Sequence, residues 1–121
     1  LRNNMSYFQI LLETYSVESG GVYPETIDKI KAYGNEINYI DFSNMYDPFH
    51  PDIKRPQVFL DYDEYQDIKN TVRKEDLKGL ILSKLGKETN SQYITRYWIY
   101  GVDYLGDLYS RGGEVFCLSN Y

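Results

Sequence analysis

An apolar stripe runs along the first 18 residues of the chain. Its members are three or four residues apart, as one face of an α-helix requires: Leu1, Met5, Phe8, Leu12 and Tyr15. Proline and glycine are absent until Gly20-Gly21, and this pair predicts the end of the helix, because glycine readily adopts the left-handed conformation that closes one. We therefore expect a helix over residues 1–18, about 27 Å long, resting on the remainder of the chain.

The back of this helix is also apolar, though more weakly. At about 100° per residue, Ile10 lies opposite the main stripe and Val17 lies close to Ile10. Two arrangements fit this pattern: a helix buried between two layers, or a helix with one face on its own domain and the other on a neighbouring subunit. Neither Leu1 nor Arg2 is a capping residue, so we expect the helix to begin further upstream in the parent protein.

Residues 20–56 predict a connection that contains one short helix. Thr26 or Glu25 is its expected N-cap and Gly34 its expected end. Its apolar residues are Ile27, Ile30 and Tyr33. Prolines together with Asn, Asp and Ser residues indicate an ordered loop over residues 35–56.

The second half of the chain predicts strands. Gln57–Tyr62, Tyr93–Tyr100 and Glu114–Leu118 are rich in β-branched and aromatic residues. A helix is expected over Glu75–Leu85, although Gly79 weakens it by ~1 kcal/mol relative to alanine. The order of elements predicts an α+β fold in which a long N-terminal α-helix packs on a small antiparallel β-sheet.

Length and composition exclude several classes of protein. A chain of 121 residues is one domain, and its single cysteine rules out an intramolecular disulfide framework or a Cys-rich metal site. The single histidine argues against zinc chemistry, and the net charge of −5 argues against nucleic acid as a partner. Phosphate-binding loops, dinucleotide fingerprints and nucleophile elbows are absent, so we expect no enzyme.

Few residues are candidates for chemistry. Asp61, Asp63 and Asp67 resemble the start of a calcium loop, but the glycine and the final glutamate of such a loop are missing. Asp103 and Asp107 lie in a glycine-rich turn and are candidates for a hard cation such as calcium, with a solvated acidic loop as the alternative.

Two other reactive residue types have simpler interpretations. His50 has no carboxylate at a suggestive spacing, so we expect a loop histidine. Cys117 alternates with larger residues near the C-terminus and is expected to be a small buried residue, because a nucleophilic cysteine would need a base beside it.

Tyrosine is unusually frequent, at 14 of 121 residues. Its ring packs like an apolar side chain while its hydroxyl reaches water, which suits a thin sheet. It also suits a recognition surface. Several tyrosines are concentrated in residues 93–109.

Three segments carry a resemblance to a known family. After the amphipathic helix come Gly21-Val22-Tyr23-Pro24 and the expected short helix. Asn44–Phe49 contains the sequence Asp-Pro-Phe, and the late strands contain Tyr97, Gly101 and Asp103 in a Y-x-x-x-G-x-D pattern. In this order, the motifs resemble those of type IV pilin-like proteins and the pseudopilins of type II secretion systems.

The resemblance implies a single pilin-like domain over residues 1–121. Residues 1–19 would be the C-terminal half of the long helix, 20–56 the connecting loop, and 57–121 the sheet region with a variable insertion at about 63–92. The upstream half of the helix would lie in the inner membrane before assembly, after removal of a short leader, and in the filament core afterwards.

The resemblance also implies a function without catalysis. The chain would be a structural subunit of a filament in the cell envelope or outside the cell. Its partners would be copies of itself, other pilin-like subunits and the inner-membrane assembly machinery. Ile10 and Val17 would face neighbouring subunits, and calcium would be the only cofactor, at Asp103 and Asp107. The residues expected to pack the helix on the sheet are Met5, Phe8, Leu12 and Tyr15.

A second function fits the charge distribution. Residues 1–66 hold eleven acidic and five basic residues, so the acidity is concentrated in the first half. A small, acidic, aromatic-rich domain of this kind is also expected of an intracellular binding module, such as an immunity protein that neutralises a basic toxin.

Overall fold

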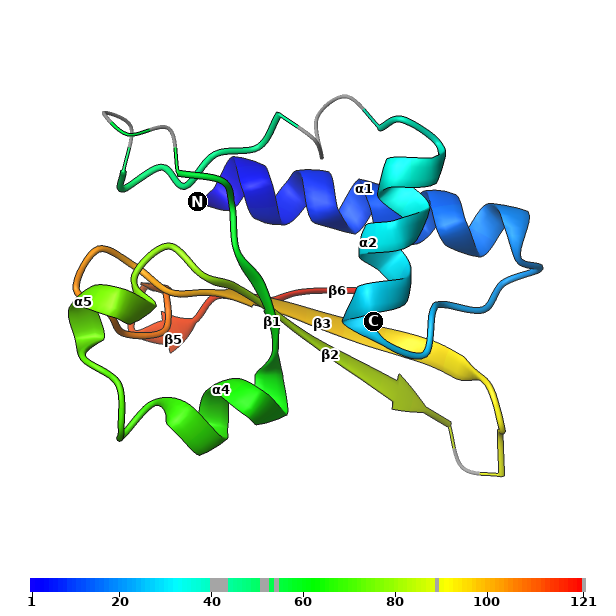
Figure 1. The fold of residues 1–121 in the computed structure, drawn as a ribbon. Coiled ribbons are helices and arrows are strands. Elements are labelled where there is room, and N and C mark those ends of the chain that lie inside the picture. The colour runs from blue at the N-terminus through cyan, green and yellow to red at the C-terminus, as the bar shows by residue number, and fades with distance from the viewer. Residues whose placement is uncertain (40–43, 51–52, 54, 89, 121) are drawn as a thin grey trace.

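A four-stranded sheet with α1 (Arg2–Glu18) on one face is the centre of the molecule (Figure 1). The computed structural model describes residues 1–39, 44–50, 53, 55–88 and 90–120. α4 (Tyr62–Ile68) lies on the side of the sheet opposite α1. The prediction of an α+β fold is therefore confirmed, with an N-terminal helix and a small sheet that is mostly antiparallel.

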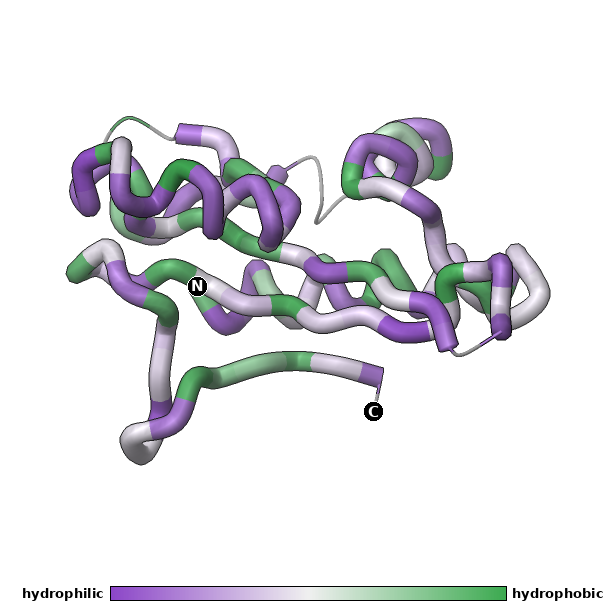
Figure 2. The backbone as a smooth tube through the Cα atoms, turned by 90° about the horizontal axis from the view of Figure 1, so that it is seen from below, coloured by the Kyte–Doolittle hydropathy of each residue, from purple (hydrophilic) through white to green (hydrophobic). Residues whose placement is uncertain are grey.

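The strands lie in the order β1 (Phe59–Asp61), β2 (Ile81–Lys87), β3 (Ile94–Gly101) and β6 (Leu118–Ser119). β2 and β3 form a long antiparallel pair, and β3 and β6 are also antiparallel. β1 runs parallel to β2, so the expectation of a wholly antiparallel sheet is wrong at this edge. The reason is the crossover through α4, which returns the chain to the same end of the sheet. Seen from below, the C-terminal segment runs along the opposite margin (Figure 2).

α1 ends as the sequence predicts. Gly20 and Gly21 both have positive φ angles, of 73° and 94°. The N–H of Gly21 donates to the carbonyl of Ser16 at 2.8 Å, which satisfies one of the last carbonyls of the helix. At the other end, Leu1 makes no side-chain cap.

α2 (Ile27–Glu36) lies across α1 (Figure 1). Thr26 is its N-cap, and its hydroxyl accepts from the N–H of Lys29 at 3.3 Å. The predicted end at Gly34 is wrong, because the helix continues to Glu36 and buries Gly34 within it. The chain leaves the helix near Asn38, which has a φ of +54°.

The segment between β1 and β2 differs most from the prediction. The predicted strand stops at Asp61, whose carboxylate caps α4, so Tyr62 begins a helix. The predicted helix over Glu75–Leu85 is wrong: α5 (Lys74–Leu77) is one turn, and the rest of that range enters β2. Gly79 separates the two elements with a φ of +87°, which ends the helix.

Residues 63–92, expected to be a variable insertion in the sheet region, contain β2. It lies between β1 and β3, and its first three residues are buried. Ile81 packs in the cluster under α1, whereas Leu82 packs in the cluster under α4. A strand with both faces covered shows a continuous apolar run, which periodicity alone does not distinguish from a helix.

The predicted last strand, Glu114–Leu118, is two short strands. β5 (Glu114–Val115) pairs with β4 (Ser110–Arg111) in a separate hairpin. β6 returns to the main sheet beside β3. The Gly112-Gly113 turn, with both φ angles positive, closes the hairpin between them.

Two apolar clusters hold the layers together. The larger lies between the helices α1 and α2 and the sheet, and the smaller lies between α4, α5 and the opposite face. The larger cluster includes Met5, Phe8, Leu11, Leu12, Ile30, Ile81 and Ile99, all fully buried. The smaller contains Tyr65, Leu77, Leu80, Leu82 and Val102.

Candidate functional site

The outward face of α1 carries the residues that are expected to contact neighbouring subunits. Ile10 is 50% exposed and Val17 is 84% exposed. They are seven residues apart and therefore lie on the same side of the helix. The alternative of a helix buried between two layers is wrong, because nothing in the described part of the chain covers this side of α1.

The inward face of α1 contains the expected packing residues. Met5, Phe8 and Leu12 are fully buried, and the Phe8 ring stacks on Phe59 of β1 with centroids 4.9 Å apart. Tyr15 is partly buried and lies edge-on to Tyr33 of α2, at 5.1 Å.

The predicted stripe omits Leu11, which is also fully buried. Leu11 lies on the side of the stripe that faces α2, beside Phe8 and Tyr15. A helix covered by both a sheet and a second helix buries a broader face than an a/d stripe does. The signal for this was present in the sequence, since Leu11 is apolar and adjacent to the stripe.

One edge of α1 is fastened to the sheet by hydrogen bonds. The hydroxyl of Tyr97 donates to Glu13 Oε1 at 2.6 Å, and Gln9 Nε2 donates to that same hydroxyl at 3.0 Å. The Tyr23 hydroxyl also donates to the Glu13 carboxylate, at 3.1 Å. Burial, followed by the hydrogen bond to Glu13, raises the pKa of Tyr97 above its ordinary value. We call Gln9, Glu13, Tyr23 and Tyr97 the anchor cluster.

The anchor cluster brings together two of the motifs that carried the resemblance. Tyr23 of the Gly21–Pro24 segment donates its N–H to the carbonyl of Ile94 in β3, and its ring lies edge-on to Tyr97 at 5.1 Å. Sequence reasoning missed Gln9 and Glu13, because polar residues on a helix carry no sign of a partner more than 80 residues away.

Gly101 and Asp103 complete the late-strand motif. A side chain at Gly101 would lie 3.0 Å from the Leu1 side chain, so glycine lets the start of α1 approach β3 closely. Asp103 Oδ1 accepts from the N–H groups of Leu105 and Asp107, at 2.9 and 3.1 Å. Its carboxylate thus shapes the turn that follows the strand.

The Asp-Pro-Phe loop has a structural role as well. Asp47 is 3% exposed, and its carboxylate accepts from the N–H of Phe49 at 2.9 Å and pairs with His50 Nδ1 at 2.9 Å. The expectation that His50 has no carboxylate partner is therefore wrong, because the turn brings Asp47 within reach. The Phe49 ring lies 6.5 Å from that of Tyr104.

The candidate calcium ligands already have partners. Lys74 Nζ lies 2.7 Å from Asp107 Oδ1, and Asp103 holds two backbone N–H groups. Within the described residues, no group of three or more potential metal ligands converges. Calcium at Asp103 and Asp107 stays a prediction, and a cation there would compete with the Lys74 ammonium.

Cys117 is half-buried beside β3. Burial raises the pKa of its thiol, which keeps the sulfur protonated and poorly nucleophilic. Asp61, Asp63 and Asp67 lie at the start and along α4, where Asp61 caps the helix.

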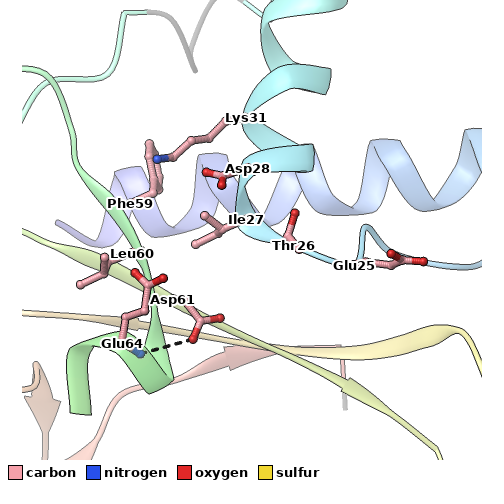
Figure 3. Close-up of a pocket in the computed structure, with 9 residues that line it drawn as sticks. All are labelled: Glu25, Thr26, Ile27, Asp28, Lys31, Phe59, Leu60, Asp61 and Glu64. Carbon is pink, nitrogen blue, oxygen red and sulfur yellow. Dashed lines mark hydrogen bonds between the residues drawn. The ribbon is translucent and has the colours of Figure 1, made fainter. Parts of the chain in front are cut away.

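An acidic pocket of about 340 Å³ lies between α2, β1 and α4 (Figure 3). Its apolar lining residues are Ile27, Phe59 and Leu60. One cation, Lys31, faces it. Its acidic lining residues are Glu25, Asp28, Asp61 and Glu64.

No helix among the described residues is both long enough and apolar enough to cross a membrane. The arrangement is a helix fastened along one edge to a sheet, with Ile10 and Val17 exposed on its outward side. Comparisons with protein-family models, with curated proteins and with solved structures find no significant match.

Proposed function

We propose that this chain is a structural subunit of a type IV pilus-like or type II secretion pseudopilus filament. The observation that carries the proposal is the setting of α1, which lies along one face of a small sheet and leaves Ile10 and Val17 exposed. A helix whose second side exposes two apolar residues suits a subunit that packs its helix against other copies.

The motifs support the proposal because each serves the attachment or the surroundings of α1. Tyr23 and Tyr97 hydrogen-bond to Glu13 on the helix, and Gly101 makes room for Leu1 at its start. The Asp-Pro-Phe turn lies close by, since the α1 residue Asn4 donates to the carbonyl of Tyr46 at 2.8 Å. The family-like segments therefore form one structural unit around the helix.

Assembly would proceed without covalent chemistry. The exposed side of α1 would meet a different surface of the next subunit, and such a heterologous contact that does not close produces a helical filament. The partners would be copies of this chain, other pilin-like subunits and the inner-membrane assembly machinery. The subunit would be membrane-anchored before assembly and lie in the envelope or outside the cell afterwards.

The test uses the full-length gene in its own host. Ile10→Asp and Val17→Asp place a charge on the proposed contact and should lower the yield of sheared filaments at least tenfold while the subunit stays folded. Val115→Asp is the matched control, because Val115 is 48% exposed but lies in the β4–β5 hairpin. Undiminished filaments in both α1 variants would contradict the proposal.

The acidic pocket favours a second candidate, an intracellular module that binds a basic protein. The lining holds four acidic residues and one lysine, Lys31, and this acidic excess suits a lysine or arginine side chain inserted by a partner. The coding sequence upstream of Leu1 separates the two candidates. About 20 apolar residues after a short basic leader support the filament subunit, whereas a start codon close to Leu1 supports the binding module.

A further inference from the structure

The anchor cluster has a geometry that apolar packing alone does not require. Met5, Phe8 and Leu12 already fasten α1 to the sheet, but apolar contacts are not directional and tolerate small rotations of a helix. Side chains lie about 5 Å from the helix axis, so a rotation of about 30° moves them by roughly 3 Å. That movement would break every hydrogen bond to Glu13.

Glu13 is the centre of this cluster. Its carboxylate accepts from two phenols, and one of them, Tyr97, is 1% exposed. The Tyr97 hydroxyl in turn accepts from Gln9, one helical turn earlier on α1. These hydrogen bonds form at one rotation of the helix. At another rotation, the buried Tyr97 hydroxyl would lose its partners Gln9 and Glu13.

We infer that Glu13 is a positioning residue: through Tyr23 and Tyr97, its carboxylate fixes the rotation of α1 within the small range that the apolar contacts allow, and so sets the direction in which Ile10 and Val17 project. Glu13 lies on the edge of the helix that faces β3, between the buried stripe and the exposed side. The consequence for assembly rests on the proposed function, whereas the rotation itself is a property of the isolated chain.

Cysteine labelling measures the rotation directly. In a Cys117→Ser background, Ile10→Cys reports the exposed side and Tyr7→Cys reports a partly buried position at the opposite edge from Glu13. The ratio of maleimide rates at the two sites should change at least threefold when Glu13→Ala is added. It should return to the starting value with Glu13→Gln, whose amide oxygen still accepts from the phenols.

Glu18→Ala is the matched control. Glu18 is another carboxylate of α1 that accepts from a tyrosine, at 2.6 Å, but this tyrosine, Tyr33, lies on α2. Its loss should leave the labelling ratio unchanged. An equal ratio in Glu13→Ala and in the parent would overturn the inference.

A second measurement covers the case in which Glu13→Ala fails to fold. Glu13→Gln removes the negative charge and keeps the hydrogen-bond acceptor, so tyrosine titration at the ultraviolet phenolate band should show a lower pKa for Tyr97. An unchanged titration would mean that the carboxylate does not hold the phenol, and the inference would fail.

Filament yield separates this inference from the proposed function. A changed labelling ratio in Glu13→Ala with undiminished filaments would support the positioning role and contradict assembly through this face. Loss of filaments in Ile10→Asp with no change of the labelling ratio in Glu13→Ala would support assembly through this face and contradict the positioning role.

Discussion

Single residues of α1 divide into those that hold the domain together and those that face outward. Phe8 is fully buried and stacks on Phe59, whereas Ile10, two residues later, is half exposed. The two are both large apolar residues of the same helix. Their difference lies in direction alone, which makes them a matched pair for experiment.

Phe8→Ala should lower the free energy of unfolding by about 3–5 kcal/mol, because it removes a buried ring and leaves a cavity. Ile10→Ala should change it by roughly 0.5 kcal/mol or less, as surface substitutions usually do. Urea unfolding followed by circular dichroism measures both. Similar losses in the two variants would contradict the orientation of the helix.

Lys74 decides whether Asp107 is available to a cation. Its ammonium pairs with that carboxylate, and this hydrogen bond raises the pKa of Lys74. If Asp103 and Asp107 bind calcium, Lys74→Ala should strengthen the binding, seen as a larger calcium-dependent rise in the melting temperature.

Lys78→Ala is the control for that titration, because Lys78 pairs with Glu75 instead, at 2.6 Å. It should leave the calcium response as in the parent protein. Melting temperatures that do not depend on calcium in any of the three proteins would mean that Asp103 and Asp107 only shape their turn.

Among the elements, the boundary between α5 and β2 depends on one glycine. Gly79 has a positive φ, and a side chain there would overlap the carboxylate of the buried Asp47. The glycine therefore has two roles: its backbone conformation lets the chain pass from α5 to β2, and its missing side chain leaves space for the Asp-Pro-Phe loop.

Gly79→Ala should destabilise the protein by about 3 kcal/mol, since left-handed strain and overpacking each contribute. Gly112→Ala should cost only about 1 kcal/mol, because Gly112 also has a positive φ but has open space around it. Chemical denaturation compares the two. Equal losses would show that Asp47 does not occupy the space beside Gly79.

For the molecule as a whole, tyrosines connect the layers. Tyr33 joins α2 to α1, Tyr97 joins β3 to α1, and Tyr100 faces α4 from β3, beside Tyr62. Burial raises the pKa of all three, and for Tyr33 and Tyr100 it raises the pKa to about 12. The high tyrosine content thus supplies apolar contacts at several layer boundaries.

These shifts predict a loss of stability at alkaline pH. In the unfolded chain tyrosine ionises near pH 10, so the unfolded state releases protons before the folded state does. The stabilisation is therefore complete below about pH 10 and declines as the pH rises towards 12. Urea midpoints across this range measure it, and Tyr33→Phe should make the decline shallower. A midpoint that does not depend on pH would contradict the raised pKa of these hydroxyls.

The sequence by itself determined the local features of this protein. The spacing from Leu1 to Tyr15 predicted α1, Gly20-Gly21 predicted its end, and Thr26 was one of two expected caps of α2. Each of these depends on neighbouring residues and on intrinsic conformational preference, which a sequence displays directly.

The tertiary structure decided what depends on distant contacts. Ile81–Leu85 fits a helix or a buried strand equally well, and pairing with β1 and β3 makes it part of β2. Glu13 accepts a hydrogen bond from Tyr97, and His50 pairs with Asp47. Both contacts exist only in the folded chain. The exposure of Ile10 and Val17 was likewise fixed by the packing of α1 on one sheet face. Such choices follow from burial and hydrogen-bond satisfaction in three dimensions, for which local spacing carries no signal.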